Sequence, residues 1–81
     1  MRRFRITGHS MGCVEVFLNM QQDRWYDECE TDEARHDLVA HEAWRRLWDS
    51  EAKTMLKVVC DELGVDTVYR TFKRDIRVEE I

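Results

Sequence analysis

Residues 3–20, RFRITGHSMGCVEVFLNM, decide the fold because they hold two strand patterns on either side of two glycines. Residues 3–7 alternate polar and apolar side chains, which is the period of a strand with one buried face. Residues 13–20 form a denser, β-branched apolar run, typical of a strand that is buried on both faces. Gly8 and Gly12 supply the backbone freedom of a hairpin turn. We expect a hairpin in which 13–20 is the central strand and 3–7 is an edge strand.

Two helices are expected after the hairpin. Thr31 is a capping residue followed by two acids, and apolar side chains then recur at three- and four-residue steps as far as Trp48. Asp49 and Ser50 begin a second, shorter helix with a clean apolar stripe, and Gly64 is its expected end.

Two segments fit more than one pattern. Residues 21–31 are polar and fit either a loop or a short strand at 24–29. Residues 67–78 place apolar side chains at both strand and helix spacing, and their β-branched and aromatic content favours a strand. A third strand would also complete the sheet, since an isolated hairpin is only marginally stable. The expected fold is a single α+β domain over residues 1–81, in the order β-β-α-α-β, with a three-stranded antiparallel sheet on two helices.

Length and composition fit one small domain. The chain has 81 residues, three glycines and no proline, so no stretch is typical of a linker. Its three cysteines are an odd number, and no apolar run approaches the roughly 18 residues of a membrane span. No apolar signal-peptide segment follows Met1. We expect a cytoplasmic protein with free thiols and no membrane partner.

The charge is distributed unevenly along the chain. The net charge is −4, and residues 21–51 carry ten acids against four arginines, whereas residues 1–10 carry arginines and no acid. Aromatic side chains ringed by charge are typical of protein interfaces. We expect this acidic stretch to dock on a protein partner, such as a basic nucleic-acid-handling protein; the alternatives are a solvated face and an aromatic ring folded back over the helix start. The docking residues are Trp25, Tyr26, Asp27, Glu28, Glu30, Asp32 and Glu33.

In size and composition the chain is similar to small phage-encoded inhibitors, anti-CRISPR proteins among them. That similarity implies a non-enzymatic protein that inhibits a host nucleic-acid-handling machine. A homodimer is a further expectation, because an exposed edge strand at residues 3–7 can pair with its own copy.

Residues 8–12, GHSMG, match the G-x-S-x-G pattern and so resemble the nucleophile elbow of α/β-hydrolases. In that elbow the serine lies on a sharp turn between a strand and a helix, whereas a strand pattern follows Gly12 here. We therefore expect Ser10 at the tip of a hairpin loop, with no catalytic residue in the chain. The spacing of the possible zinc ligands does not suit a metal site either, so no metal or cofactor is expected. These ligands are Cys29, His36, His41 and Cys60.

A DNA-binding alternative comes from residues 56–70, LKVVCDELGVDTVYR. They resemble the helix-turn-helix of resolvase-like and homeodomain-like proteins, in which such a segment joins a supporting helix to a recognition helix. The turn is two residues shorter than in those proteins. The resemblance implies a helix in place of the strand at 67–78 and phosphate contacts from a basic cluster. That cluster is Arg70, Lys73, Arg74 and Arg77.

Overall fold

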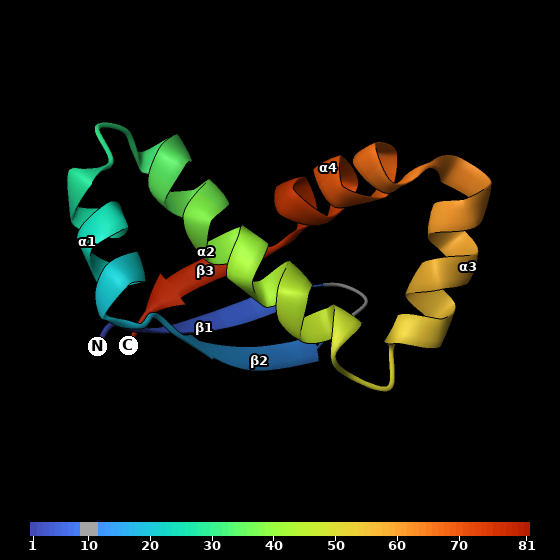
Figure 1. The fold of residues 1–81 in the computed structure, drawn as a ribbon, viewed down its shortest axis with the longest axis horizontal. Helices are drawn as coiled ribbons and strands as arrows, with labels where there is room; N and C mark the ends of the chain where they lie inside the picture. Colours follow the sequence, from blue (N-terminus) through green and yellow to red (C-terminus); the bar gives the residue numbers. More distant parts are fainter. Residues whose placement is uncertain (9–11) are drawn as a thin grey trace.

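The structure of the chain, a computed structural model, describes residues 1–8 and 12–81. Over these residues it has one sheet of three strands together with four helices (Figure 1). The strands are β1 (Arg3–Gly8), β2 (Gly12–Phe17) and β3 (Arg77–Glu80), and the helices are α1 (Met20–Glu28), α2 (Asp32–Trp48), α3 (Lys53–Leu63) and α4 (Val65–Asp75). The predicted α+β class with a three-stranded antiparallel sheet is confirmed. The expectation of two helices was wrong, because the chain also forms α1 and α4.

The sheet has the order β2-β1-β3, so β1 is its central strand. β1 pairs antiparallel with β2, with Phe4 opposite Val16, and antiparallel with β3, with Thr7 opposite Arg77. The hairpin was predicted correctly, but the positions of its strands were not. β3 pairs with the side of β1 that faces away from β2, so β2 and β3 are the two edge strands. Both sides of β1 are therefore paired, and β1 lacks the free edge that a dimer through residues 3–7 requires.

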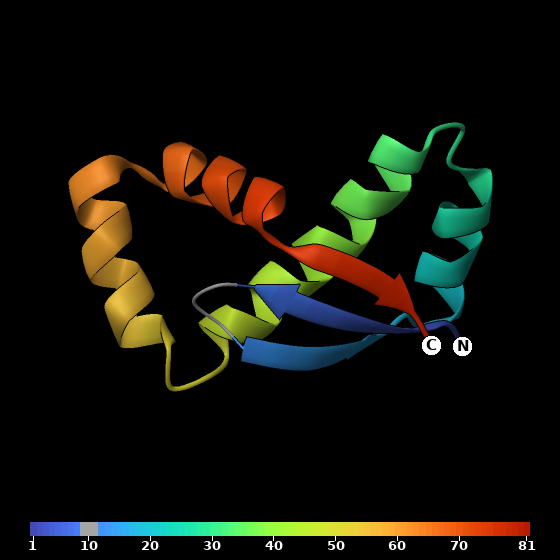
Figure 2. The same cartoon turned by 180° about the vertical axis from the view of Figure 1, so that it is seen from behind.

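The core lies between one face of the sheet and α2. The inward-facing side chains of β1 are almost fully buried, as Phe4 at 1 % exposure illustrates. The opposite face of the sheet carries exposed side chains such as Arg3, Arg5 and Phe17. Figure 2 is taken from that side, with α2 behind the strands. The buried core residues are Phe4, Ile6, Val16, Leu18, Val39, Ala40, Ala43 and Ile76.

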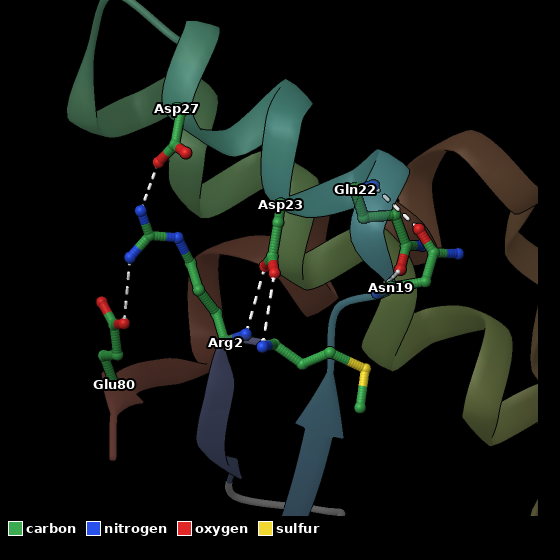
Figure 3. Close-up of polar contacts among 7 residues, drawn as sticks. Arg2, Asn19, Gln22, Asp23, Asp27 and Glu80 are labelled. Carbon is green, nitrogen blue, oxygen red and sulfur yellow. Dashed lines mark hydrogen bonds and ion pairs between the residues drawn. The ribbon is translucent and has the colours of Figure 1, made fainter.

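Helix α1 occupies the segment for which a loop or a short strand at 24–29 was expected, and both of those expectations were wrong. Asn19 begins the helix through a capping box (Figure 3). Its Oδ1 accepts from the backbone N–H of Gln22 at 2.8 Å, and its own N–H donates to Gln22 Oε1 at 2.9 Å. This exchange satisfies backbone donors that the first turn of a helix leaves unpaired.

Helices α2 and α3 correspond to the two helices that were expected, and both end near the expected residues. Thr31 Oγ1 accepts from the backbone N–H of Ala34 at 3.1 Å and caps α2, which ends at Trp48. Helix α3 ends immediately before Gly64, as expected.

The C-terminal segment was predicted incorrectly in its main part. Val65–Asp75 is the helix α4 rather than a strand, and only Arg77–Glu80 joins the sheet. The helical spacing that competed with the strand pattern prevails, because Tyr69 and Phe72 pack against Trp44 of α2, with ring centroids 5.1 and 5.2 Å apart.

Gly64 alone connects α3 to α4, and its backbone has φ 89° and ψ 139°. A side chain at such a positive φ is strained even though an added Cβ would meet no atom within 4 Å. We expect Gly64→Ala to lower the free energy of unfolding by about 1–3 kcal/mol, measured by urea denaturation. Glu62→Ala, at an exposed position just before it, is the control and should change stability little. An unchanged midpoint for Gly64→Ala would show that the junction is not strained.

Candidate functional site

The first candidate surface lies where α1 ends and α2 begins. We call it the acidic corner and define it as Trp25, Glu28, Glu30, Asp32 and Glu33. Trp25 is 50 % exposed on α1, and all four acids are exposed. Glu28 lies one turn after Trp25 on the same helix, while Asp32 and Glu33 occupy the first turn of α2. Glu28 is therefore a helical neighbour of the chain's most exposed tryptophan, and the other three acids follow within eight residues of it along the chain.

Two of the expected docking residues lie elsewhere and hold the fold together. Tyr26 is half-buried against Phe4, with ring centroids 5.4 Å apart, and the guanidinium of Arg2 lies 4.6 Å from the centroid of its ring. Asp27 accepts from Arg2, which also donates to Glu80 of β3 at 3.2 Å (Figure 3). Tyr26 is thus the ring that packs into the fold, on Phe4 of β1 rather than over the start of α2, whereas the half-exposed Trp25 faces solvent.

Arg2 joins α1 to the two terminal strands. The side-chain hydrogen bond with Asp27 is the main reason that the pKa of Arg2 lies above its ordinary value. Asp23 reinforces the same junction, since its Oδ1 accepts from the backbone N–H of Arg2 at 3.1 Å. Asp23 and Asp27 are therefore paired within the chain, so the acidic corner does not include them.

In the acidic corner itself, one acid has a partner on its own helix. Asp32 accepts from Arg35 at 2.8 Å, an exposed pair one turn apart that contributes little to stability. Glu28, Glu30 and Glu33 take part in none of the ion pairs found among the described residues. Their charge is available to a partner.

The expected basic cluster is divided between two elements. Arg70 and Arg74 lie one turn apart on α4 and are exposed. Lys73 instead turns toward α2, where its Nζ lies 3.7 Å from Asp37 Oδ1 and 5.0 Å from the centroid of the Tyr69 ring. Arg77 belongs to β3. The structure therefore brings together Arg70 and Arg74 on the exposed side of α4, whereas Lys73 contacts Asp37 and Tyr69 of the same chain.

An aromatic cluster holds α4 on α2. Trp44 is 8 % exposed and contacts Trp48, Tyr69 and Phe72. His36 Nε2 lies 2.9 Å from the backbone carbonyl oxygen of Lys73 and ties the two helices further. The cluster positions the exposed face of α4, so its role is structural.

Burial, and secondarily the charge of Asp37, raises the pKa of Tyr69. The folded chain therefore keeps this phenol proton more tightly than the unfolded chain, whose tyrosines titrate at about pH 10. We expect stability to fall as the pH rises above that value, because the unfolded state loses the proton first. An alkaline titration followed by ultraviolet absorbance should contain a late component that Tyr69→Phe removes. A titration curve without that component in the native chain would contradict the burial of this ring.

The structure also contains an apolar groove that the sequence did not indicate. Its volume is about 580 Å³, and it lies between α3, the end of α2, α4 and the sheet. The apolar stripe of α3 was expected to face the core, yet Cys60 is the one buried residue of α3. We call this cavity the α3 groove. Its main apolar lining residues are Leu47, Met55, Leu56, Val59, Val68 and Phe72.

The remaining expectations concern chemistry. Among residues 1–8 and 12–81, no group of three or more histidine, cysteine or acidic side chains is placed to hold a metal ion. No helix within that part of the chain combines the length and the apolar character needed to cross a bilayer. His9, Ser10 and Met11, which were expected at the tip of a hairpin loop, lie outside the described residues.

The chain was compared with protein-family models, with curated proteins and with solved structures, and none of the three comparisons found a match.

Proposed function

We propose that this chain is a small, non-enzymatic binding protein that docks its acidic corner on a basic surface of a protein partner. The observation that supports the proposal is the half-exposed Trp25 side chain with three exposed acids close to it in the chain, Glu28, Glu30 and Glu33, which take part in none of the ion pairs found among the described residues. A nucleic-acid-handling protein is the class of partner that best matches a cluster of carboxylates, since it presents basic side chains to phosphates.

Trp25 and the acids would contribute in different ways. Docking would bury the exposed half of the indole, and tryptophan is among the residues that supply most of the binding energy at interfaces. The acids would attract the basic partner over a distance of about 8–10 Å and accelerate association, an effect that salt weakens. Trp25 should therefore govern the lifetime of the complex, and the acids its rate of formation.

The proposal extends to inhibition of a host nucleic-acid-handling machine in the manner of anti-CRISPR proteins. A carboxylate surface can occupy a site that otherwise binds phosphates, and such competition requires no chemistry from the inhibitor. We also place the protein in the cytoplasm. Its three cysteines, all among the described residues, are free thiols, which suits a reducing compartment.

The test is capture of the partner by the tagged chain from a lysate of the source cells, followed by measurement of affinity. Trp25→Ala should weaken binding about 30-fold or more, the loss that corresponds to a hot spot of about 2 kcal/mol. Met20→Ala is the matched control, because Met20 is a large exposed apolar residue of the same helix at 82 % exposure. Equal affinity of Trp25→Ala and the native chain would rule out the acidic corner.

A second candidate function is DNA binding through α4. It is favoured by the finding that residues 65–75 form a helix, with Arg70 and Arg74 exposed on one side. Two features differ from a helix-turn-helix: the connection is a single residue rather than three or four, and α3 is largely exposed. A mobility shift of duplex DNA that weakens with salt and disappears in the Arg70→Ala/Arg74→Ala double variant would establish it. Arg45→Ala/Arg46→Ala, a pair of exposed arginines on α2, is the control.

A further inference from the structure

Strand β2 is an edge strand whose outer side is free to pair. The backbone N–H of Leu18 donates to the carbonyl oxygen of Arg2 at 3.0 Å, so the even-numbered residues of β2 direct their backbone groups toward β1. Cys13, Glu15 and Phe17 direct theirs to the opposite side, and none of the hydrogen bonds in turns, loops and caps of the described residues involves these three. β2 forms the lower edge of the sheet in both views, with no helix of the described residues below it (Figures 1 and 2).

The two edges of the sheet differ in how well they are protected against pairing. β3 has four residues, RVEE, of which three are charged, and charged side chains on a short strand discourage pairing at an edge. β2 has six residues, GCVEVF, and carries a single charge. An apolar edge strand offers a template on which another strand can form. The edge of β2 is therefore the one suited to binding.

The α3 groove lies beside the same edge. Val14 is opposite the buried Ile6 of β1, so its side chain points to the face of the sheet that carries α2, and it also lines the groove. A strand added to β2 would place one side chain on that face with its Cβ about 4.5–5.5 Å from that of Val14. This side chain would reach the groove, whose volume of about 580 Å³ is several times that of a cavity of about 150 Å³ that holds benzene.

We propose that the free edge of β2 binds an extended segment of another protein, which joins the sheet as an additional antiparallel strand. Antiparallel pairing continues the arrangement of the sheet and is slightly more stable per residue than parallel pairing. Backbone hydrogen bonds supply affinity in this mode of binding, and pockets for alternate side chains supply specificity. The segment therefore carries apolar side chains on the side of the groove and polar side chains on the open face.

The charge of Glu15 adds a requirement for one residue of the segment. Glu15 is exposed at the centre of the free edge and takes part in none of the ion pairs found among the described residues. Opposite charges on directly paired residues of two strands stabilise the pairing, and like charges destabilise it. The residue opposite Glu15 is therefore lysine or arginine.

A second copy of this chain fits the edge less well than a separate segment. Pairing of two β2 edges over their full length would centre on Glu15 and bring two carboxylates opposite each other, which is unfavourable. The side chains that β2 carries on the groove face include Val16, which is completely buried in its own core and so could not enter the groove of a copy. A segment with free apolar side chains satisfies both the edge and the groove.

This surface goes beyond the acidic corner and is separate from it. The junction of α1 and α2 and the free edge of β2 lie at the top and the bottom of Figure 1. Trp25→Ala should therefore leave binding at β2 unchanged, and failure of either proposal leaves the other intact.

The first experiment uses a synthetic eight-residue peptide, capped at both ends, in which leucine alternates with polar residues and a lysine occupies a central polar position. We expect calorimetry to detect its binding to the native chain. N-methylation of two amides of the polar residues, which face β2, should weaken binding at least about tenfold, because each methyl group removes a hydrogen bond. N-methylation of two leucine amides, which face away, is the control and should preserve the affinity. Absence of binding at about 1 mM peptide, or equal losses for the two methylated peptides, would overturn the proposal.

The second experiment tests the residues of the edge. Glu15→Lys should weaken binding of the lysine peptide about threefold and strengthen binding of a peptide with glutamate in its place by a similar factor. Glu79→Lys is the matched control, because Glu79 lies on the same face of the sheet, opposite Arg5 of β1, but belongs to the other edge strand.

The peptide also tests the contribution of the groove. Replacement by serine of the leucine that lies next to Val14 should weaken binding at least about tenfold, since its burial is lost. Unchanged affinity for that peptide, or equal effects of Glu15→Lys and Glu79→Lys, would contradict this arrangement. A native chain that has twice its mass of 9.8 kDa by light scattering and does not bind the peptide would overturn it in favour of a second copy.

Discussion

Phe4→Ala is expected to lower the free energy of unfolding by about 3–5 kcal/mol, the usual range for removal of a buried phenylalanine. Phe4 belongs to the central strand, is 1 % exposed and packs against Tyr26 of α1. Its ring therefore joins the sheet to a helix as well as filling the core. A loss of that size is a large part of the roughly 5–15 kcal/mol that stabilises a folded domain.

Phe17→Ala is the matched control for this prediction. Phe17 is the same residue type on the neighbouring strand, but it lies on the open face of the sheet and is 41 % exposed. Its removal leaves no enclosed cavity, so we expect a loss of less than about 1 kcal/mol. Urea denaturation followed by circular dichroism measures both variants. Equal losses at positions 4 and 17 would contradict the burial of one face only.

Trp44→Ala is expected to cause a loss of similar size, about 3–5 kcal/mol. Trp44 is 8 % exposed and contacts the rings of Trp48, Tyr69 and Phe72. The variant removes the contacts that hold α4 on α2, so the C-terminal half of the chain should lose protection first. Hydrogen exchange of the α4 amides should accelerate more than that of β1 and β2.

Trp25→Ala is the control, because it removes an exposed tryptophan rather than a buried one. Because Trp25 is half exposed on α1, we expect its removal to change stability by at most about 0.5 kcal/mol. The same variant should lose partner binding. Comparison of Trp25→Ala with Trp44→Ala therefore separates an effect on binding from an effect on stability. If Trp44→Ala were as stable as Trp25→Ala, the aromatic cluster would not hold the helices together.

The parts of the fold that depend on local patterns could be predicted from the sequence. The alternation around Phe4 and Ile6 marks a strand, and the cap at Thr31 marks the start of α2. Helix α1 was missed because Asn19 lies at the end of the apolar run that was assigned to a strand. The pair Asn19 and Gln22, a capping box in sequence as well as in structure, is the signal that could have identified it.

The order of the strands could not be predicted because it depends on tertiary pairing. β3 has the sequence RVEE, which has little strand propensity. It joins the sheet because the side of β1 that faces away from β2 carries a row of backbone groups that need hydrogen-bond partners. The same reasoning explains α4. Its apolar residues fit both strand and helix spacing, and the aromatic surface of α2 around Trp44 decides between them.

The candidate site shows a similar division. The acidic charge and the tryptophan of the corner are visible in the sequence, but the opposite fates of the neighbours Trp25 and Tyr26 follow from how α1 lies on the sheet. The α3 groove could not be predicted, because an amphipathic stripe normally indicates a helix packed on the core. Nothing in the amino-acid sequence of α3 shows that the helix stands away from the rest of the fold.

The position of β1 has a consequence for the way the chain folds. Its contacts with β2 close a short loop, whereas its contacts with β3 join the two ends of the chain. Closing the longer loop costs about 2–3 kcal/mol more in chain entropy, by the logarithmic dependence on loop length. The hairpin can therefore form early, while β3 docks only after the intervening helices have brought it close. During synthesis on the ribosome, the sheet stays incomplete until residues 77–80 have emerged.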